Sequence, residues 1–252
     1  MANGCISISR ILDKLDEHLC RNDYAAAERH LLYWLSESSS ACDGRTELLI
    51  RNELMGLYRK LGRESDAIAC AHAALSKIDE LGVSEQVGSA TTYLNAATVY
   101  KAFGRAADAI PLFERARAIY ERELEDNDTR LGGLYNNMAL ALVDLLRFDE
   151  ANALYGRAVE VMGRTDGGDL EVAITYLNMA SAAEAECGLV DADERIQKHL
   201  DDAEAILEAH AKRDGYYAFV CEKCASVFGY YGRFFYENEL KERARRIYYE
   251  RT

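Results

Sequence analysis

The chain has 252 residues, of which 29% are charged and 49% hydrophobic, and its formal net charge is −13. This composition is typical of a folded protein and excludes a disordered one. The acidic balance argues against a general nucleic-acid-binding protein, and no apolar run approaches the roughly 18–20 residues of a membrane span. We therefore expect neither nucleic acid nor membrane among its partners.

The sequence favours an intracellular protein. Its N-terminal stretch, MANGCISISRILDKLDEHL, has no basic start followed by an apolar run, so we expect no secretory signal. The seven cysteines are odd in number and scattered, unlike the disulfide framework of a secreted domain. The corresponding prediction is a cytoplasmic location.

The periodicity of the chain is helical throughout. There is one proline, Pro111, and alanine-rich segments with spacings of three and four dominate. No alternating, β-branched run bounded by turn residues suggests a strand, so the predicted class is all-α. In chain order, six helical pairs are expected over about 6–37, 46–81, 90–124, 132–163, 171–210 and 215–251, within a single domain spanning 1–252.

The clearest of these pairs lies near the middle of the chain. A first helix is expected over about 90–103, where Gly104 ends it, and a second over about 106–124. Each helix carries one stripe of small and large apolar residues, which predicts that the two pack closely. The stripes are Tyr93, Ala97 and Tyr100 in the first helix and Ala109, Phe113 and Ala116 in the second.

An internal repeat runs through the chain. TYLNAATVY at 92–100 returns as LYNNMALAL at 134–142 and as TYLNMASAA at 175–183. Tyrosines and asparagines recur at intervals of 42 and 41 residues, at Tyr93, Tyr135 and Tyr176 and at Asn95, Asn137 and Asn178. A repeat of this length predicts a solenoid of stacked helical pairs.

The repeat resembles the tetratricopeptide repeat (TPR) family. The family pattern is a large residue, a small one, Tyr, Gly, and then Ala, an aromatic and Ala. It is found at Tyr93, Ala97, Tyr100, Gly104, Ala109, Phe113 and Ala116, and again, with departures, at Tyr135, Ala139, Leu142, Leu146, Ala151, Tyr155 and Ala158. A period near 42 and the Leu94-Asn95 and Leu177-Asn178 motifs are similar to kinesin light chain repeats. The His-Pro common between those repeats is absent, so the resemblance does not imply the kinesin role.

The resemblance implies a right-handed α–α superhelix, a TPR solenoid of about six helical hairpins, whose first helices line a concave groove. In register, the hairpins contribute a row of polar residues to that groove: Asp13, Glu53, Asn95, Asn137, Asn178 and Lys223. Candidate peptide-binding residues are Asn95, Asn137, Asn178, Thr98, Asn136, Ser181, Arg59, Lys60 and Lys101.

Two roles stay open for the repeated asparagines. An Asn side chain offers both donors and an acceptor, so a row of them suits the backbone of an extended peptide. Alternatively, each Asn bonds a carbonyl of the adjoining helix and only locks the stack. The sequence leaves both interpretations standing.

No catalytic or metal motif is visible. Cys221 and Cys224 form the only close cysteine pair, whereas a zinc site usually needs two such pairs. We expect these thiols to pack in a helical core, and we expect no metal, no cofactor and no enzyme.

The predicted function is a non-catalytic module that binds a protein or peptide in its groove. Nine aromatic residues crowd positions 216–236 of the last helical pair, although a solenoid end is normally polar. This crowding suggests an alternative, a scaffold that forms homo-oligomers through Tyr230, Phe234 and Phe235. A peptide-sensing regulator is a further alternative.

Overall fold

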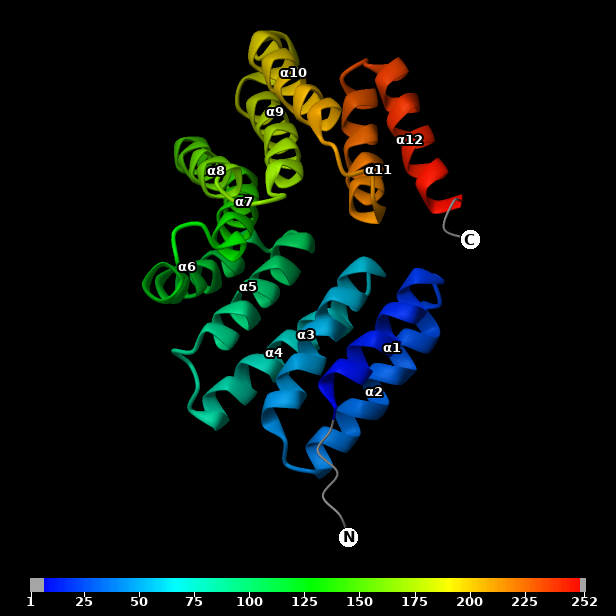
Figure 1. The fold of residues 1–252 in the computed structure, drawn as a ribbon. Coiled ribbons are helices and arrows are strands. Elements are labelled where there is room, and N and C mark those ends of the chain that lie inside the picture. The colour runs from blue at the N-terminus through cyan, green and yellow to red at the C-terminus, as the bar shows by residue number, and fades with distance from the viewer. Residues whose placement is uncertain (1–6, 250–252) are drawn as a thin grey trace. The chain divides into compact units, whose positions relative to one another are not determined.

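The computed structural model describes residues 7–249, which form twelve α-helices and no strand (Figure 1). The helices are α1 (Ile8–Cys20), α2 (Tyr24–Ser40), α3 (Gly44–Lys60), α4 (Glu64–Leu81), α5 (Val87–Ala102), α6 (Ala106–Glu123), α7 (Thr129–Asp144), α8 (Phe148–Gly163), α9 (Asp169–Asp191), α10 (Asp193–Ala209), α11 (Gly215–Tyr230) and α12 (Phe234–Tyr249). Successive helices pack in pairs, α1 with α2 through α11 with α12. The predicted all-α chain of six helical hairpins is confirmed.

The chain divides into two compact units, Met1–Glu123 and Leu124–Thr252. The first contains the hairpins from α1 to α6, and the second those from α7 to α12. Each unit has a buried apolar core, drawn from its own helices. The expectation of one continuous repeat domain stays a prediction.

The third hairpin shows how the repeat positions shape each pair. Tyr93 of α5 and Phe113 of α6 are buried, and Ala97 and Ala109 are fully buried between the two helices. Alanine at these positions lets the helix backbones approach, so the large rings beside them fill the remaining space at the density of a protein interior. The predicted packing stripes are confirmed, and α5 begins at Val87, three residues before the expected start.

The turns inside the hairpins share a backbone conformation. Five of them contain one residue with positive φ, in chain order Asn22, Gly62, Gly104, Leu146 and Gly232. In the fifth hairpin the residue with positive φ is Gly188, which interrupts the helical backbone inside α9. Glycine takes this left-handed conformation without strain, and asparagine tolerates it. Leu146 is therefore the exception, and its side chain is exposed.

Several turns, one inside the first hairpin and the others between hairpins, end in an aspartate that caps the next helix. The carboxylate of Asp43 accepts a hydrogen bond from the backbone N–H of Thr46 at the start of α3, at 3.1 Å. Equivalent caps begin α2, α7 and α11, at Asp23, Asp128 and Asp214. Such caps satisfy backbone donors that the first helical turn leaves free.

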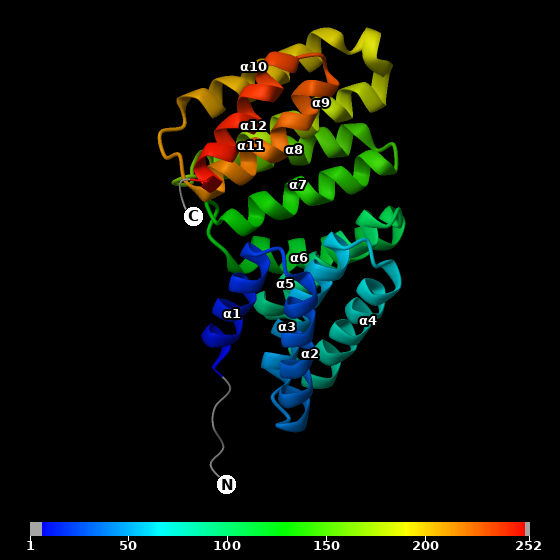
Figure 2. The same cartoon turned by 90° about the vertical axis from the view of Figure 1, so that its right-hand side faces the viewer.

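The aromatic residues of the last hairpin separate into two groups. Tyr217, Phe228 and Tyr236 are buried in the core of the second unit, and the rings of Phe228 and Tyr236 meet edge to face with centroids 4.8 Å apart. Tyr216, Phe219, Tyr230, Phe234 and Phe235 are exposed. The core of α11 and α12, which lie side by side in Figure 2, thus accounts for only part of the crowding.

Cys221 and Cys224 lie in the same core, as predicted. Both thiols are buried, and burial raises the pKa of Cys221 to about 11 and that of Cys224 to about 12. Neither thiol is poised for reaction at neutral pH, because the reactive form is the thiolate.

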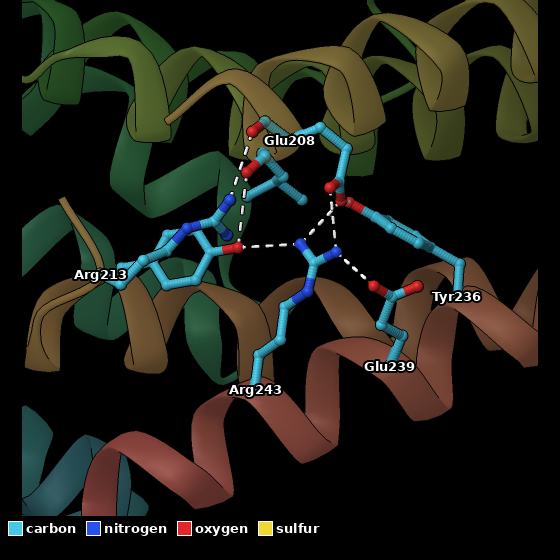
Figure 3. A network of polar contacts seen from close by, with 7 residues as sticks. Glu208, Arg213, Tyr236, Glu239 and Arg243 are labelled. Atoms are coloured by element: carbon cyan, nitrogen blue, oxygen red, sulfur yellow. Dashed lines mark hydrogen bonds and ion pairs between the residues drawn. The ribbon is translucent and has the colours of Figure 1, made fainter. Parts of the chain in front are cut away.

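A polar network joins the last three helices (Figure 3). The Arg243 guanidinium of α12 donates to both carboxylate oxygens of Glu208 on α10, at 2.7 and 2.9 Å, and to the hydroxyl of Tyr217 on α11, at 3.0 Å. The Tyr236 hydroxyl donates to the same carboxylate at 2.7 Å. Arg243 also pairs with Glu239. Hydrogen bonds from Arg243 lower the pKa of Glu208.

We predict that Arg243→Lys destabilises the last hairpin by about 1 kcal/mol, because an ammonium cannot reproduce the forked contact with Glu208. Hydrogen exchange of the α11 and α12 amides measures this directly. Arg246→Lys, on an exposed face of the same helix, is the control. Equal exchange in the two variants would show that the network contributes nothing to stability.

Candidate functional site

The repeated asparagines join neighbouring hairpins. In the first unit, Asn95 Nδ2 of α5 donates to Asn52 Oδ1 of α3, at 2.9 Å. Asn52 Nδ2 in turn donates to Thr92 Oγ1 of α5 at 2.9 Å, and to Leu48 O in its own helix at 3.0 Å. These amides form a two-way bridge between the first helices of two successive hairpins.

The second unit repeats the bridge. Asn178 Nδ2 of α9 donates to Asn136 Oδ1 of α7, at 3.0 Å. Asn137 behaves differently, because its Nδ2 donates to Gly133 O one turn earlier in α7, at 2.8 Å. The three repeated asparagines therefore do not share one role: two of them bridge helices and the third bonds its own helix.

The bridges leave part of each amide available. Asn95 and Asn178 are half-buried, and within residues 7–249 neither Oδ1 accepts a hydrogen bond. Each side chain fixes its neighbour through one N–H and still presents an acceptor. The bridge resembles the predicted structural role, in which each Asn joins its helix to the adjoining one, but the partner is an amide side chain and not a backbone carbonyl. The bridge does not exclude contact with a ligand.

A groove of about 480 Å³ lies over the bridge of the first unit. It is lined by α3, α5 and the turn before α5, through Arg45, Leu48, Leu49, Asn52, Glu53, Val83, Gln86, Gly88, Ser89, Thr91, Thr92 and Asn95. Its lining combines apolar side chains with amides and hydroxyls, the mixture typical of ligand pockets of roughly 300–1,000 Å³.

The repeat register predicts that Asn95 and Glu53 face the groove, and it does not predict a role for Asn52. The register aligns Asn95 with Glu53, whereas the residue that bridges to Asn95 is one position earlier, at Asn52. A signal was present, because Asn52 and Asn136 are two repeat lengths apart and both accept from an asparagine of the next hairpin.

The other predicted site residues of the first unit are not part of this groove's lining. Thr98 Oγ1 donates to Leu94 O of its own helix at 2.8 Å. Arg59 and Lys60 are exposed at the end of α3, where Lys60 Nζ lies 5.0 Å from the Tyr24 ring centroid, and Lys101 is half-buried near the end of α5. The structure therefore does not bring the predicted basic residues to the Asn95 groove.

In the second unit, Ser181 lines a smaller hollow of about 320 Å³, together with Glu184, Ser226, Val227, Tyr230 and Tyr231. Glu184 accepts hydrogen bonds from the hydroxyls of Tyr230 and Tyr231, both at 2.7 Å. These bonds tie α11 to α9. Tyr230 is thus anchored at its hydroxyl while its ring stays exposed.

Residues 7–249 contain no group of three or more His, Cys, Asp and Glu side chains placed to hold a metal ion. Over the same residues, no helix has both the length and the apolar character that a bilayer crossing needs.

Comparison with known proteins identifies the repeat. The sequence model of the tetratricopeptide repeat matches residues 47–122, which include α4, α5 and most of α3 and α6. No curated protein sequence matches the chain.

The fold has solved counterparts. BtubC (BKLC) from P. vanneervenii superposes with a TM-score of 0.69 and 20% identity, over 81% of this chain and 82% of that one. A putative kinesin light chain with TPR-like repeats from Podosopora anserina gives a TM-score of 0.55 and 17% identity, over 81% of this chain and 95% of that one. The predicted resemblance to kinesin light chain-type repeats and the TPR solenoid class are confirmed.

We predict that the Asn52–Asn95 bridge stabilises the first unit. In a double-mutant cycle of Asn52→Ala and Asn95→Ala, the two losses should couple by about 0.5–1.5 kcal/mol, the net value of a partly buried hydrogen bond. Urea unfolding of the four proteins measures this coupling. Asn137→Ala with Asn52→Ala is the control pair, because Asn137 bonds only its own helix. Additive losses in the bridge pair would show that the two amides do not support each other.

Proposed function

We propose, because the chain carries tetratricopeptide repeats and its described hairpins follow that fold, that it is a non-catalytic module whose first unit holds an extended peptide segment of a partner protein in the groove over Asn52 and Asn95. Proteins with this repeat are generally protein–protein interaction modules. The finer proposal depends on one observation, the polar groove built on a prearranged amide bridge.

The chemistry of the lining suits a peptide backbone. Gln86 and Asn95 offer amide groups at the groove surface, and Leu48, Leu49 and Val83 offer apolar contacts. Backbone contacts of this kind are independent of sequence, whereas the apolar contacts select side chains. Because the bridge already orders Asn95, binding does not have to immobilise that side chain, which reduces the entropic cost of association.

In the second unit, Asn137 and Asn178 stay candidate contacts on the equivalent helices, α7 and α9. We propose the same backbone-bonding role for them, and for Asn136 beside them.

Cytoplasmic location is part of the proposal, since the described cysteines Cys20, Cys42, Cys70, Cys187, Cys221 and Cys224 are unpaired.

The test begins with selection of twelve-residue peptides from a phage-displayed random library on the immobilised protein. We expect Gln86→Ala and Asn95→Ala each to weaken a selected peptide by about two- to tenfold, the loss of one hydrogen bond. Calorimetric titration measures this. Thermal unfolding of the same variants separates the roles: Gln86→Ala should leave the melting temperature unchanged, because its side chain is exposed and lines only the groove.

Arg59→Gln, outside the groove, is the matched control and should not change the affinity by more than twofold. A selected peptide that binds both groove variants with the wild-type affinity would rule the groove out. A lowered melting temperature with unchanged affinity in Asn95→Ala would make that residue structural only.

A second candidate function is a scaffold that associates through its last hairpin. Phe235 is 95% exposed, Tyr230 68% and Phe234 63%, and all three lie at the turn between α11 and α12. Large apolar side chains grouped on a surface often mark an interface. We predict a dimer in sedimentation at tens of micromolar, and a monomer for the double variant Tyr230→Glu with Phe235→Glu. A monomeric wild-type protein would remove this candidate.

A further inference from the structure

One carboxylate in the groove of the first unit has no cationic partner. Glu53 of α3 lines the groove and is half-buried, and within residues 7–249 it forms no hydrogen bond or ion pair. Burial raises the pKa of its carboxyl, and the negative charge of Asp16 on α1 adds to the rise. The fold therefore holds an acidic side chain where its charged form is disfavoured.

Glu47, a buried carboxylate on the same helix, is an example of an acidic side chain with a structural role. Glu47 accepts hydrogen bonds from Arg51 at 2.7 and 3.0 Å, and Lys77 of α4 lies 3.4 Å from its second oxygen. Burial acts to raise the pKa of Glu47, but Arg51 and Lys77 lower it overall. The same helix thus compensates one carboxylate within the protein and leaves the other uncompensated at an open groove.

An uncompensated charge in a groove indicates a ligand of opposite charge. Burial disfavours the ionised form of Glu53, and no cation within residues 7–249 pairs with it, so a bound ligand can supply the compensating charge. The α5 side of the groove cannot supply one, because Gln86, Thr91, Thr92 and Asn95 carry no charge.

The groove also has a positive end. Arg45 lines it, is exposed, and its guanidinium forms no ion pair or hydrogen bond within the described residues. Arg45 and Glu53 are eight positions apart on α3, which is about 12 Å along the helix at 1.5 Å per residue. In an extended peptide, residues four apart point to the same side and are separated by roughly 13 Å. The two spacings match.

We propose that the groove selects a segment with a basic and an acidic side chain four residues apart, the basic side chain bound by Glu53 and the acidic one by Arg45. This inference rests on the proposed peptide-binding function and narrows it to a ligand chemistry. A lysine or arginine head group donates to the Glu53 carboxylate, and an aspartate or glutamate accepts from the Arg45 guanidinium. The bridge amides beside them bond the intervening backbone.

The probes are two blocked peptides that differ only in direction, Gly-Lys-Ala-Ala-Ala-Asp-Gly and Gly-Asp-Ala-Ala-Ala-Lys-Gly. Each is compared with versions in which norleucine replaces lysine or asparagine replaces aspartate. Titration of the ¹⁵N-labelled protein gives the affinity from the shifts of α3 and α5 amides. For one direction, we expect norleucine to weaken binding by about tenfold, the value of one charge-assisted hydrogen bond.

The protein variants complete the cycle. Glu53→Gln should abolish the preference for lysine over norleucine and keep the preference for aspartate, and Arg45→Gln should do the reverse. Glu64→Gln, an exposed carboxylate in the first turn of α4, is the matched control and should change neither. The lysine preference should fall as the pH is lowered through the pKa of Glu53. Arg45 is the other ionisable residue in the groove lining, and the charge of Asp16 on α1 also acts on Glu53.

A second readout needs no ligand. A carboxyl whose pKa is raised in the folded state contributes stability below its unfolded pKa and loses it as the pH rises through the folded pKa. Glu53→Gln should therefore raise the melting temperature at pH 7. A lowered melting temperature would mean that Glu53 supports the fold, and the proposal would fall.

The results of these experiments distinguish the charge-selective site from the proposed peptide-binding function. Equal affinity for the lysine and norleucine peptides, or a lysine preference that survives in Glu53→Gln, overturns the charge-selective site and leaves peptide binding intact. No shift of groove amides with any of these peptides also overturns it. Wild-type affinity of the library-selected peptides for Gln86→Ala and Asn95→Ala would instead be the failure of the proposed function.

Discussion

The close approach of paired helices is the constraint on which this structure depends. Ala97, Ala109 and Ala116 are fully buried, so the two helices of the third hairpin meet almost backbone to backbone. A larger side chain at any of these positions would separate the helices and displace Tyr93 and Phe113, because an interior packed at crystal density does not absorb extra volume. With this face of each hairpin committed to packing, the opposite side of the first helix is available for polar residues. The groove exists there for this reason.

The sequence was sufficient to predict the hairpins because their determinants are local and periodic. The positions of Tyr93, Ala97 and Gly104 recur at intervals of about 42 residues, and each position has one geometric requirement: a large side chain, a small side chain or a left-handed backbone. The end of the first helix at Gly104 and the burial of Cys221 and Cys224 followed from the same kind of argument. Where the residues that determine a feature lie inside one hairpin, their spacing in the sequence is enough to predict that feature.

The groove was less predictable because it depends on which of two adjacent residues faces which way. Successive helical residues differ by about 100° around the axis, so Asn52 and Glu53 point in clearly different directions although they are neighbours. An alignment error of one position exchanges the residue that bridges to α5 for the residue that lines the groove without a partner. The repeat intervals of 41 and 42 residues are uneven enough to permit that error. Charge compensation is also not local: Glu47 is paired through Lys77 of another helix, which no periodicity in α3 reveals.

The amide bridges restrict which hairpins of this solenoid can be recombined. A side-chain amide that needs a complementary amide on the next hairpin discriminates between neighbours, in the way that a single buried Asn sets the register of a coiled coil. Hairpins carrying Asn52 and Asn95, or Asn136 and Asn178, are matched as ordered pairs. Recombining hairpins across such a pair would leave an amide without its partner in a half-buried site, whereas cutting between matched pairs would not. The amide pairs therefore favour one particular neighbour for each of these hairpins. Shuffled or designed arrays built from this chain would be most stable when both hairpins of a matched pair are moved together.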